Sequence, residues 1–453
     1  MTKFNIDPNG KLRPIHTKHG IPQFYEMVGM ECPICHKKGW CLLSAKQDTV
    51  VCMRTPEKGR KILFNGYVYS LDENKRTSYN LSKLVSPVSE EQQPDNIQHK
   101  VYSLVIKTLG LNKSDENHLI KVRGLNRKQI RLRGYCSTDR SSLMKQIDGQ
   151  GTIWEELFKS NGLPKNAWNG VAGFFYDEEH HCPVFQVKSG IAIPCRNQYG
   201  QIVGMQIRVN PSDMSYFAKY SDKRLEGKNG KLITSVHFDN TTGKLLYRVR
   251  LASSPENIIA EGVCKAGEKI ICHYKGVKFD FKIATSPKYL FATSIGKKHG
   301  TIARSLPHFA FSDSVLSKAE FDAEGNGKVD LFKLIDRKSV IITEGLLKGD
   351  IIASYLEKTD LSNLGSQLVV AVAGVNVWNK AYYVLDKLKV ERIFSAFDQD
   401  FETNNSVFDQ MERMIDKFIA HKFQTYLLTW SIGKGLDDCI LNNGLSTVVV
   451  NQY

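Results

Sequence analysis

"AFDQDFETNN", residues 396–405, follows directly on an apolar run and places two aspartates, Asp398 and Asp400, two positions apart. One acid after a strand is ordinary. Two acids at positions i and i+2 behind an apolar run are typical of a site for a hard cation, which prefers oxygen ligands. We therefore predict that "RIFSAF" (392–397) is a buried strand and that it ends at a cation site.

The segments around this stretch alternate between short apolar runs and helical patterns. We predict strands at 339–343, 367–373, 392–397 and 424–430, and helices at 346–356, 377–388 and 405–421. The last helix is amphipathic, with Met411, Ile415 and Phe418 on one stripe. Strands that alternate with helices of this length predict an α/β fold with a parallel, doubly wound sheet covered by helices on both faces.

Acidic residues follow three of the four predicted strands. Glu344 comes after the first strand, Asp398 and Asp400 after the third, and Asp437 and Asp438 after the fourth. Functional residues of such sheets gather beyond the carboxyl ends of the strands. For any single acid, a helix cap or a solvated loop end is the better interpretation. For the whole set we favour a site for Mg²⁺ or Mn²⁺, because clustered carboxylates repel one another unless a cation lies between them.

The composition sets the broad class of the protein. The 453 residues suffice for about three domains. There is no apolar run of 18 or more residues, and the beginning "MTKFNIDPNG" lacks the apolar core of a signal peptide. We therefore expect a cytoplasmic protein without membrane contact. A net charge of +15 suits a nucleic-acid partner, although a generic basic surface explains the charge equally well.

Four of the ten cysteines are grouped near the N-terminus, in "CPICHKKGWC…VVC". Cysteines of a cytosolic protein are expected to be reduced, so a group of them is interpreted first as metal ligands. Cys32 and Cys35 form a Cys-x-x-Cys knuckle, and a hairpin brings Cys41 close to Cys52. Four thiolates complete a tetrahedral structural Zn²⁺ site. A second Cys-x-x-Cys is missing, so His36 is an alternative to Cys41 as a ligand.

The motifs "TEG", "AVAGV", "DQD" and "GKGLDD", in this order, resemble the Toprim domain over roughly residues 336–445. That domain is shared by DnaG-type primases, type IA and type II topoisomerases and some nucleases. The resemblance implies that Glu344 is the general acid or base and that Asp398 and Asp400 hold Mg²⁺. It also implies that Asp437 or Asp438 assists them.

A narrower resemblance is carried by "EGLLKGD", "AGVNVW", "DQDFETN" and "GKGLDD". These motifs look like the Toprim-primase domain in replication proteins of plasmids, phages and integrative elements. The chain departs from the DnaG pattern after Asp400, where Phe401 and Glu402 replace the usual small residues. This departure weakens the transfer of DnaG detail but leaves the metal ligands in place.

The region before the motifs resembles the basic lobe of DnaG-type cores. "IPCRNQYGQIVGMQIR" (193–208) is similar to a strand–turn–strand signature of that lobe, and "SPKYLFATS" (286–294) to its lysine-bearing segment, with Phe291 where asparagine is expected. The candidates for contacts with nucleotide or template phosphates are Arg196, Arg208, Lys288, Arg304 and Lys348. For any one of the arginines, and for Lys288, a solvated position on a strand edge is an equally good explanation.

The cysteine-bearing region resembles the zinc-binding domain that precedes many primase cores and contacts single-stranded template. The aromatic side chains that are candidates for stacking on bases, or for the small core of this domain, are Trp40, Phe64, Tyr67 and Tyr69. The basic segment "HLIKVRGLNRKQIRLRGYCS" (118–137) looks like the small helical region before the Toprim core of the mobile-element proteins, and either backbone contacts to nucleic acid or a solvated helix face explains its charge.

These features together predict five parts of the chain. They are a zinc ribbon (1–84), a linker (85–100), a helical region (101–170), a basic α+β lobe (171–335) and a Toprim domain (336–453). We expect a primase of a mobile element that joins NTPs or dNTPs on single-stranded DNA. No Gly-x-x-x-x-Gly-Lys-Ser/Thr motif occurs, so a helicase or polymerase partner is expected in another chain.

Two other functions fit the same residues. In a Toprim nuclease, the cation would activate water instead of a 3′-hydroxyl group. A non-catalytic accessory would bind single-stranded DNA and load a partner polymerase or helicase. A topoisomerase fits less well, because the chain has little room for a strand-passage apparatus.

Overall fold

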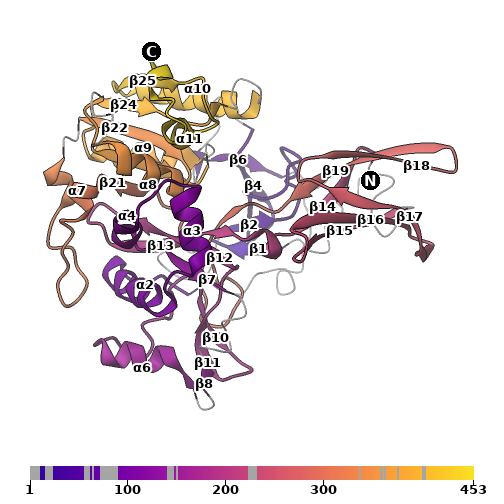
Figure 1. Cartoon of the computed structure of the whole chain (residues 1–453), viewed down its shortest axis with the longest axis horizontal. Coiled ribbons are helices and arrows are strands. Elements are labelled where there is room, and N and C mark those ends of the chain that lie inside the picture. The colour runs from indigo at the N-terminus through magenta and orange to yellow at the C-terminus, as the bar shows by residue number, and fades with distance from the viewer. Residues whose placement is uncertain are drawn as a thin grey trace. The chain divides into compact units, whose positions relative to one another are not determined.

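The computed structural model describes residues 11–15, 24–55, 62–63, 66–71, 90–139, 147–148, 151–222, 232–335, 338–357, 361, 364–374, 377–399 and 405–453 (Figure 1). Phe64, Asp400, Phe401 and Glu402 lie outside these residues. The chain divides into two compact units, Met1–Glu91 with Ile295–Ile302 and Gln92–Ser294 with Ala303–Tyr453. None of the helices in the described part of the chain has the length and apolar character needed to span a bilayer.

The described strands of the first unit form an antiparallel sheet in the order β1-β2-β3-β4-β6-β5. Their bounds are Lys11–Pro14, Phe24–Val28, Leu42–Ser44, Thr49–Cys52, Ile62–Leu63 (β5) and Gly66–Ser70 (β6). The expected hairpin between Cys41 and Cys52 is present as β3 and β4, with Leu42 opposite Val51. Buried apolar residues such as Met27 pack against three of the four grouped cysteines.

The second unit begins with helices. They are α2 (Asp95–Leu109), α3 (Lys113–Lys121), α4 (Arg127–Arg133) and α6 (Ile153–Ser160). Helix α2 starts at Asp95, within the segment 85–100 that the sequence predicts to be a linker, so the predicted linker is too long at its C-terminal end. Its first turns look polar in the sequence, but Gln98 and His99 are buried. The side chains of Asn112 and Asn126 cap α3 and α4.

A small antiparallel sheet follows, in the order β20-β13-β12-β7. The bounds are Cys136–Thr138 for β7, Gly190–Arg196 for β12, Ile202–Val209 for β13 and Tyr289–Phe291 for β20. Strands β12 and β13 are the predicted strand–turn–strand, and Gly200 in their turn has a φ of 77°, which favours glycine. Short strand pairs flank this sheet, β8 (Ile147–Asp148) with β9 (Gly151–Thr152) and β10 (Phe174–Asp177) with β11 (Cys182–Phe185).

A strand-rich insertion lies between β13 and β20. Its antiparallel sheets have the orders β14-β19-β18 and β15-β16-β17 and share a core that includes Val249 and Phe281 (Figure 1). The bounds are Tyr216–Tyr220, Leu232–Asp239, Lys244–Leu251, Ser254–Cys264, Lys269–Tyr274 and Val277–Thr285 for β14 to β19.

The C-terminal sheet has the order β21-β23-β22-β24-β25-β26. The bounds are His308–Phe311, Ser339–Glu344, Leu368–Val372, Arg392–Ser395, Gln424–Thr429 and Val449–Gln452 for β21 to β26. Strands β23, β22, β24 and β25 pair in parallel, as the alternation of strands and helices predicts. The antiparallel edge strands β21 and β26 were not expected.

Helices cover both faces of this sheet. Residues of α9 (Trp378–Lys387) and α10 (Asn405–Ala420) form one apolar cluster with Val340 and Ile342 of β22. Residues of α8 (Leu346–Tyr355) and α11 (Leu436–Leu441) form another with Ile341 on the opposite face. Burial on both faces explains why these strands are apolar throughout, and it leaves their carboxyl ends as the place for polar groups.

Candidate functional site

The parallel pairing of the sheet brings the predicted acids to one edge. Glu344 is the last residue of β22, Asp398 follows β24, and Asp437 lies at the start of α11 after β25. The backbone N–H of Gln399 donates to the carbonyl of Lys434 at 3.1 Å, which joins the loops after β24 and β25. The edge is therefore a continuous surface of loop backbone that carries carboxylates.

Two glycines permit this arrangement. Gly345 turns the chain from β22 into α8 with a φ of 90°, a conformation that side chains disfavour. A Cβ atom on Gly435 would lie 2.4 Å from Oδ1 of Asp437 and 3.1 Å from Oδ1 of Asp398. The two carboxylates thus approach the same point, as does Nζ of Lys348 at 3.3 Å, and any residue larger than glycine would fill it.

Asp398 is 6% exposed and is surrounded by positive charge. The ammonium group of Lys348, on α8, donates to Oδ1, and Nζ of Lys434 lies 3.2 Å from Oδ2. An ionised carboxylate with so little water around it needs compensating charge, which these two lysines supply. Asp398 is therefore held between two ammonium groups.

Asp437 is fully buried. Its Oδ2 atom lies 3.4 Å from Nη1 of Arg123, whereas its Oδ1 atom has no hydrogen-bond partner among the described residues. Burial raises the pKa of Asp437, and the negative charges of Asp438 and Asp398 act in the same direction. A buried oxygen without a partner, beside a second carboxylate, is a donor set that fits Mg²⁺ or Mn²⁺.

Basic side chains from distant segments surround these acids. Burial lowers the pKa of Lys288, and the charges of Arg208 and Arg123 lower it further, so the three cations lie close together. The charge of Asp438 opposes this shift, so Lys288 lies within electrostatic range of that acid. Burial and the same group of cations also lower the pKa of His118 to about 4. The carboxylates therefore lie next to a dense group of positive charges.

Two of the predicted phosphate contacts lie elsewhere. The guanidinium group of Arg196 is buried and donates to the carbonyls of Gly200 at 2.7 Å and Arg133 at 2.9 Å. Arg304 pairs with Asp95 at 3.5 Å, at the start of α2. Arg196 thus connects β12 to its own turn and to α4, and this position argues against a role in phosphate binding.

The full set of predicted Mg²⁺ ligands is only partly described. Asp400 lies outside the described residues, and Glu344 is half-buried at the end of β22. Within the described part of the chain, the grouped cysteines are the only set of three or more metal-ligating side chains whose ligand atoms lie within 4.8 Å of one another. Asp398 and Asp437 both approach the position next to Gly435. A third acidic ligand at that position remains a prediction.

Sequence reasoning missed Arg123 and Lys434. Arg123 lies in a segment noted only for its charge density, and no spacing marks it as a partner of Asp437, 314 positions later. Lys434 lies in "GKGLDD". In this motif the two acids were interpreted as ligands and the lack of a phosphate-binding loop was noted, but the lysine was given no role. The signal that could have identified Lys434 was therefore the motif itself, which places a lysine three residues before the first of two acids.

A buried ionic network fixes α8 beside the site. Nη1 of Arg133 on α4 lies 2.6 Å from Oδ1 of Asp350, and the hydroxyl group of Tyr135 donates to Oδ2 at 2.7 Å. Burial acts to raise the pKa of Asp350, but the charges of Arg133 and His308 and the hydrogen bonds from His308 and Tyr135 lower it to about 2. Because Asp350 and Lys348 share α8, this network also sets the position of Lys348.

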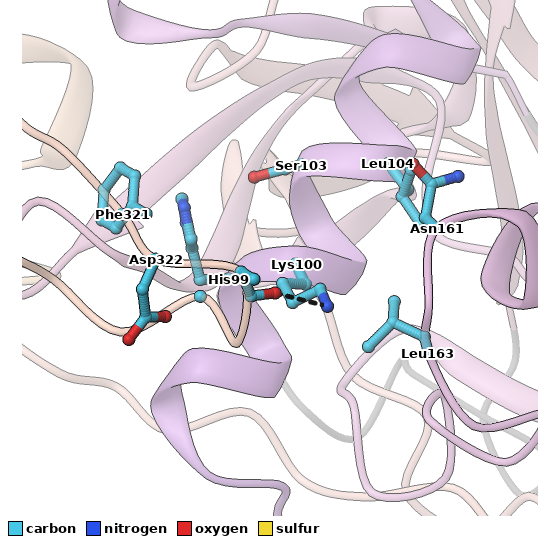
Figure 2. A pocket seen from close by; sticks show the side chains of 10 residues that line it. His99, Lys100, Ser103, Leu104, Asn161, Leu163, Phe321 and Asp322 are labelled. Carbon is cyan, nitrogen blue, oxygen red and sulfur yellow. Dashed lines mark hydrogen bonds between the residues drawn. The ribbon is translucent and has the colours of Figure 1, made fainter.

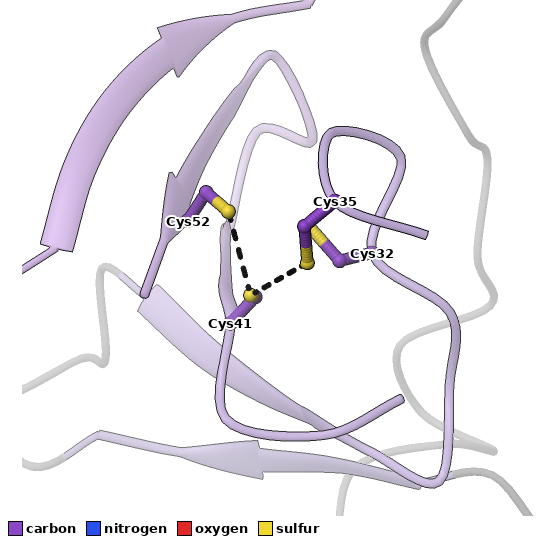
Figure 3. Close-up of side chains that lie close together, drawn as sticks. All are labelled: Cys32, Cys35, Cys41 and Cys52. Carbon is purple, nitrogen blue, oxygen red and sulfur yellow. Dashed lines mark hydrogen bonds between the residues drawn. The ribbon is translucent and has the colours of Figure 1, made fainter. Parts of the chain in front are cut away.

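The grouped cysteines form the second candidate site, in the first unit (Figure 3). The four sulfur atoms all lie within 4.8 Å of one another, with 3.8 Å between Cys35 and Cys41 and 3.9 Å between Cys41 and Cys52. The hydrogen bond between Cys32 and Cys41 lowers the pKa of Cys32 to about 5 and raises the pKa of Cys41, so the two thiols share a proton when no metal is bound. Four converging thiols in a small domain fit a structural Zn²⁺ ion.

The structure decides between Cys41 and His36. The ring of His36 is 68% exposed and its Nδ1 atom lies 3.2 Å from a carboxylate oxygen of Glu31. Cys41, in contrast, is buried among the other sulfur atoms. Cys41 therefore completes the group, and His36 does not.

Arg54 supports the cysteine group from outside. Its Nη1 atom lies 3.8 Å from the sulfur atoms of both Cys35 and Cys41 and donates to the carbonyl of Gly39 at 2.9 Å. Its guanidinium group also lies 5.5 Å from the ring centre of Trp40, which is 55% exposed. Tyr69 is buried in the core instead. Of the described aromatic candidates, Trp40 is thus the one with the most accessible ring.

A pocket of about 230 Å³ lies between α2 and the segment 321–325 (Figure 2). Its polar groups are already used within the protein. Nδ1 of His99 accepts from the backbone N–H of Ile202 at 3.1 Å, and the ammonium group of Lys100 donates to the carbonyl of Ala323 at 2.9 Å. The sheet edge is the better candidate for chemistry.

Comparison with known proteins gives one matching family model, over part of the chain, and a group of solved structures. The family model described as "Domain of unknown function (DUF3854)" matches residues 333–447. The chain is similar to the zinc-binding and RNA polymerase domains of the Aquifex aeolicus primase, with 12% identity and a TM-score of 0.42 over 95% of this chain and 80% of that one. No curated protein sequence matches the chain.

Two further solved structures are similar over a smaller share of the chain. A DNA primase domain from Pseudomonas aeruginosa has 12% identity and a TM-score of 0.41, over 79% of this chain and 80% of that one. The E. coli primase catalytic core has 10% identity and a TM-score of 0.40, over 77% of each chain. Likenesses of this degree assign no activity to the chain.

Proposed function

We propose that this protein is a Toprim-type primase of a mobile genetic element, such as a plasmid or phage, and that it joins NTPs or dNTPs on single-stranded DNA. The observation that carries the proposal is the sheet edge. Asp398 and Asp437 meet there at one point, beside cations from three distant segments that include Arg208 and Lys288. Acids that hold a metal ion, next to fixed cations that hold phosphates, are what nucleotidyl transfer requires.

The cation would be held by Asp398 and Asp437, with Glu344 and Asp400 as the further ligands that the motifs predict. Bound there, Mg²⁺ or Mn²⁺ would make the 3′-hydroxyl group more acidic and neutralise charge on the leaving pyrophosphate. We assign Glu344, at the end of β22, as the group that accepts the proton of that hydroxyl group. The 3′-oxygen forms a bond to the α-phosphorus atom, and the bond to pyrophosphate breaks.

The cations that border the acids suit the triphosphate. Arg208 lies in β13 and Lys288 directly precedes β20, so their backbones are fixed and would need little reorganisation to bind phosphate oxygens. Lys348 neutralises Asp398 in the structure, and we assign it to a nucleotide phosphate when a metal ion takes over that role. This group of cations favours polymerisation over hydrolysis, because a nuclease has no triphosphate to bind.

We assign the zinc-binding unit to template binding. The four cysteines hold its hairpin, and Trp40 offers an exposed ring on which a base can stack. The zinc ion has a structural role there, since four sulfur ligands leave no open position for chemistry. A helicase or polymerase in another chain is the proposed partner, because a primase without a helicase motif needs one for replication.

Primer synthesis tests the proposal. The full chain is incubated with single-stranded DNA, labelled NTPs or dNTPs, and Mg²⁺ or Mn²⁺, and the products are separated on a gel. We expect short products, which are lost in Asp398→Asn because it removes the carboxylate at the shared point. Asp416→Asn, an exposed acid on α10, is the matched control and retains activity.

Other results of this assay would contradict the proposal. Degradation of the template that Asp398→Asn abolishes would identify a Toprim nuclease. Tight DNA binding with neither synthesis nor degradation, under all combinations of nucleotide and metal ion, would identify an accessory that loads a partner. Synthesis at the wild-type rate in Asp398→Asn would show that the sheet edge is not the active site.

A further inference from the structure

The outer face of the sheet β14-β19-β18 is not explained by the proposed catalysis. Its inner face packs against the other sheet of the insertion, with Phe281 fully buried. Side chains alternate strictly along β18, so that Ile270 and Cys272 are buried whereas Lys269 and Ile271 are exposed. The outer face therefore carries a regular pattern of exposed side chains.

Three lysines form a row across this face. Lys219 of β14 lies directly opposite Lys282 of β19, and Lys282 lies directly opposite Lys269 of β18. All three are exposed. Neighbouring strands are about 4.8 Å apart, so the row spans about 10 Å. Like charges in directly opposite positions destabilise a sheet, so this arrangement is costly unless something negative binds to it.

The protein itself neutralises only part of this charge. Asp280 is the only acid among the described outward-facing residues of the three strands, and it pairs with Lys269 at 3.2 Å. Lys219 and Lys282 form no ion pair with any residue that the structure describes. Lys278 adds a further positive charge two positions from Asp280 on the same strand. The face is thus strongly positive.

Apolar side chains border the lysine row. Phe217 lies two residues before Lys219 on β14 and is 41% exposed, with the ammonium group of Lys219 at 5.7 Å from its ring centre. Ile271 lies two residues after Lys269 on β18 and is 53% exposed. An exposed ring next to fixed positive charges is the combination that proteins use for single-stranded nucleic acid, in which bases are free to stack.

We propose that this face binds single-stranded nucleic acid, with phosphates on the row Lys219–Lys282–Lys269 and a base on Phe217. A duplex fits less well, because its bases are already stacked and leave the ring without a partner. An anionic membrane surface fits less well than a nucleic acid, because the exposed apolar residues are separate and form no continuous patch. The proposal does not depend on catalysis at the sheet edge, since binding is measured without nucleotides.

Salt-dependent binding of a 30-nucleotide oligo(dT) tests the lysine row. The wild-type chain is compared with the triple variant Lys219→Gln, Lys269→Gln and Lys282→Gln. Each lost phosphate contact lowers the slope of log K against log salt by about 0.7, so we expect the slope to fall by about 2. The control removes equal charge from exposed lysines elsewhere, with Lys318→Gln, Lys333→Gln and Lys387→Gln. It should leave the slope unchanged.

Phe217→Leu tests the stacking contact and keeps an apolar side chain at that position. We expect it to weaken oligo(dT) binding at least about fivefold and to leave binding of a matched duplex unchanged. Circular dichroism verifies that each variant is folded. An equal slope for the triple variant and its control would overturn the proposal. So would equal effects of Phe217→Leu on the single strand and the duplex, or a triple-variant defect seen only with phosphatidylserine vesicles.

Discussion

His99 lies on the buried side of α2, where its Nδ1 atom accepts a hydrogen bond from the backbone N–H of Ile202 at 3.1 Å. Only a ring nitrogen without a proton can accept this bond. Burial, together with the charge of Arg196, lowers the pKa of His99 to about 4. Ile202 begins β13, the strand that also carries Arg208 to the sheet edge, so this histidine contributes to the position of a site residue.

The protonation of His99 makes stability depend on pH. The folded pKa is below the ordinary value of 6.5, so the unfolded chain binds the proton more readily. The contribution to stability is thus complete above pH 6.5 and is lost as the pH falls toward 4. The free energy of unfolding of the wild-type chain should fall between pH 7 and pH 5. We expect this fall to be about 2 kcal/mol smaller in His99→Asn.

Urea unfolding at the two pH values measures this difference. His273→Asn is the control, because His273 is exposed on β18 and its replacement should leave the decrease as in the wild type. If His99→Asn loses as much stability between pH 7 and pH 5 as the wild-type chain, the buried neutral histidine is not the cause.

The elements differ in how well the sequence predicts them. Strands β22 to β25 are predictable because burial on both faces makes them apolar throughout, with amphipathic helices between them. The edge strand β26 is not, because all four of its residues are exposed and it shows no buried face. The start of α2 was missed for the opposite reason, since its buried side chains include the polar residues Gln98 and His99. At both places tertiary contacts, and not local pattern, determine the structure.

The hairpin of β3 and β4 has the group of four cysteines at its base, and we expect its stability to depend on a zinc ion held there. The first unit has a small core, so we expect that zinc binding supplies much of its folding free energy. Cys41→Ser should lose bound zinc and expose the amides of β3 and β4 to hydrogen exchange. His36→Ala should keep both the zinc and the protection, because the ring of His36 pairs with Glu31 outside the sulfur group.

Zinc content by mass spectrometry and hydrogen exchange of the same samples provide the measurement. Removal of the metal ion with a chelator should reproduce the exchange pattern of Cys41→Ser. A chain that retains one zinc ion in Cys41→Ser but loses it in His36→Ala would contradict the ligand assignment.

Across the whole molecule, the sequence predicts which acids lie at the strand ends better than it predicts how distant side chains meet. The acids at the strand ends follow from a local rule about parallel sheets, which is why Asp398 and Asp437 were found. The contact between Arg123 and Asp437 joins segments 314 positions apart, and no pattern in either segment points to the other. The same holds for Arg196, whose motif suggests phosphate binding although its guanidinium group is buried.

The central claim is that the sheet edge binds a divalent cation through Asp398 and Asp437. Binding of Mn²⁺ to the zinc-loaded full chain, followed by electron paramagnetic resonance, tests this claim without relying on activity. We predict that Asp398→Asn and Asp437→Asn each weaken or abolish a Mn²⁺ site that is present in the wild-type chain and in Asp416→Asn. Equal Mn²⁺ binding in the wild type and in both edge variants would contradict the claim.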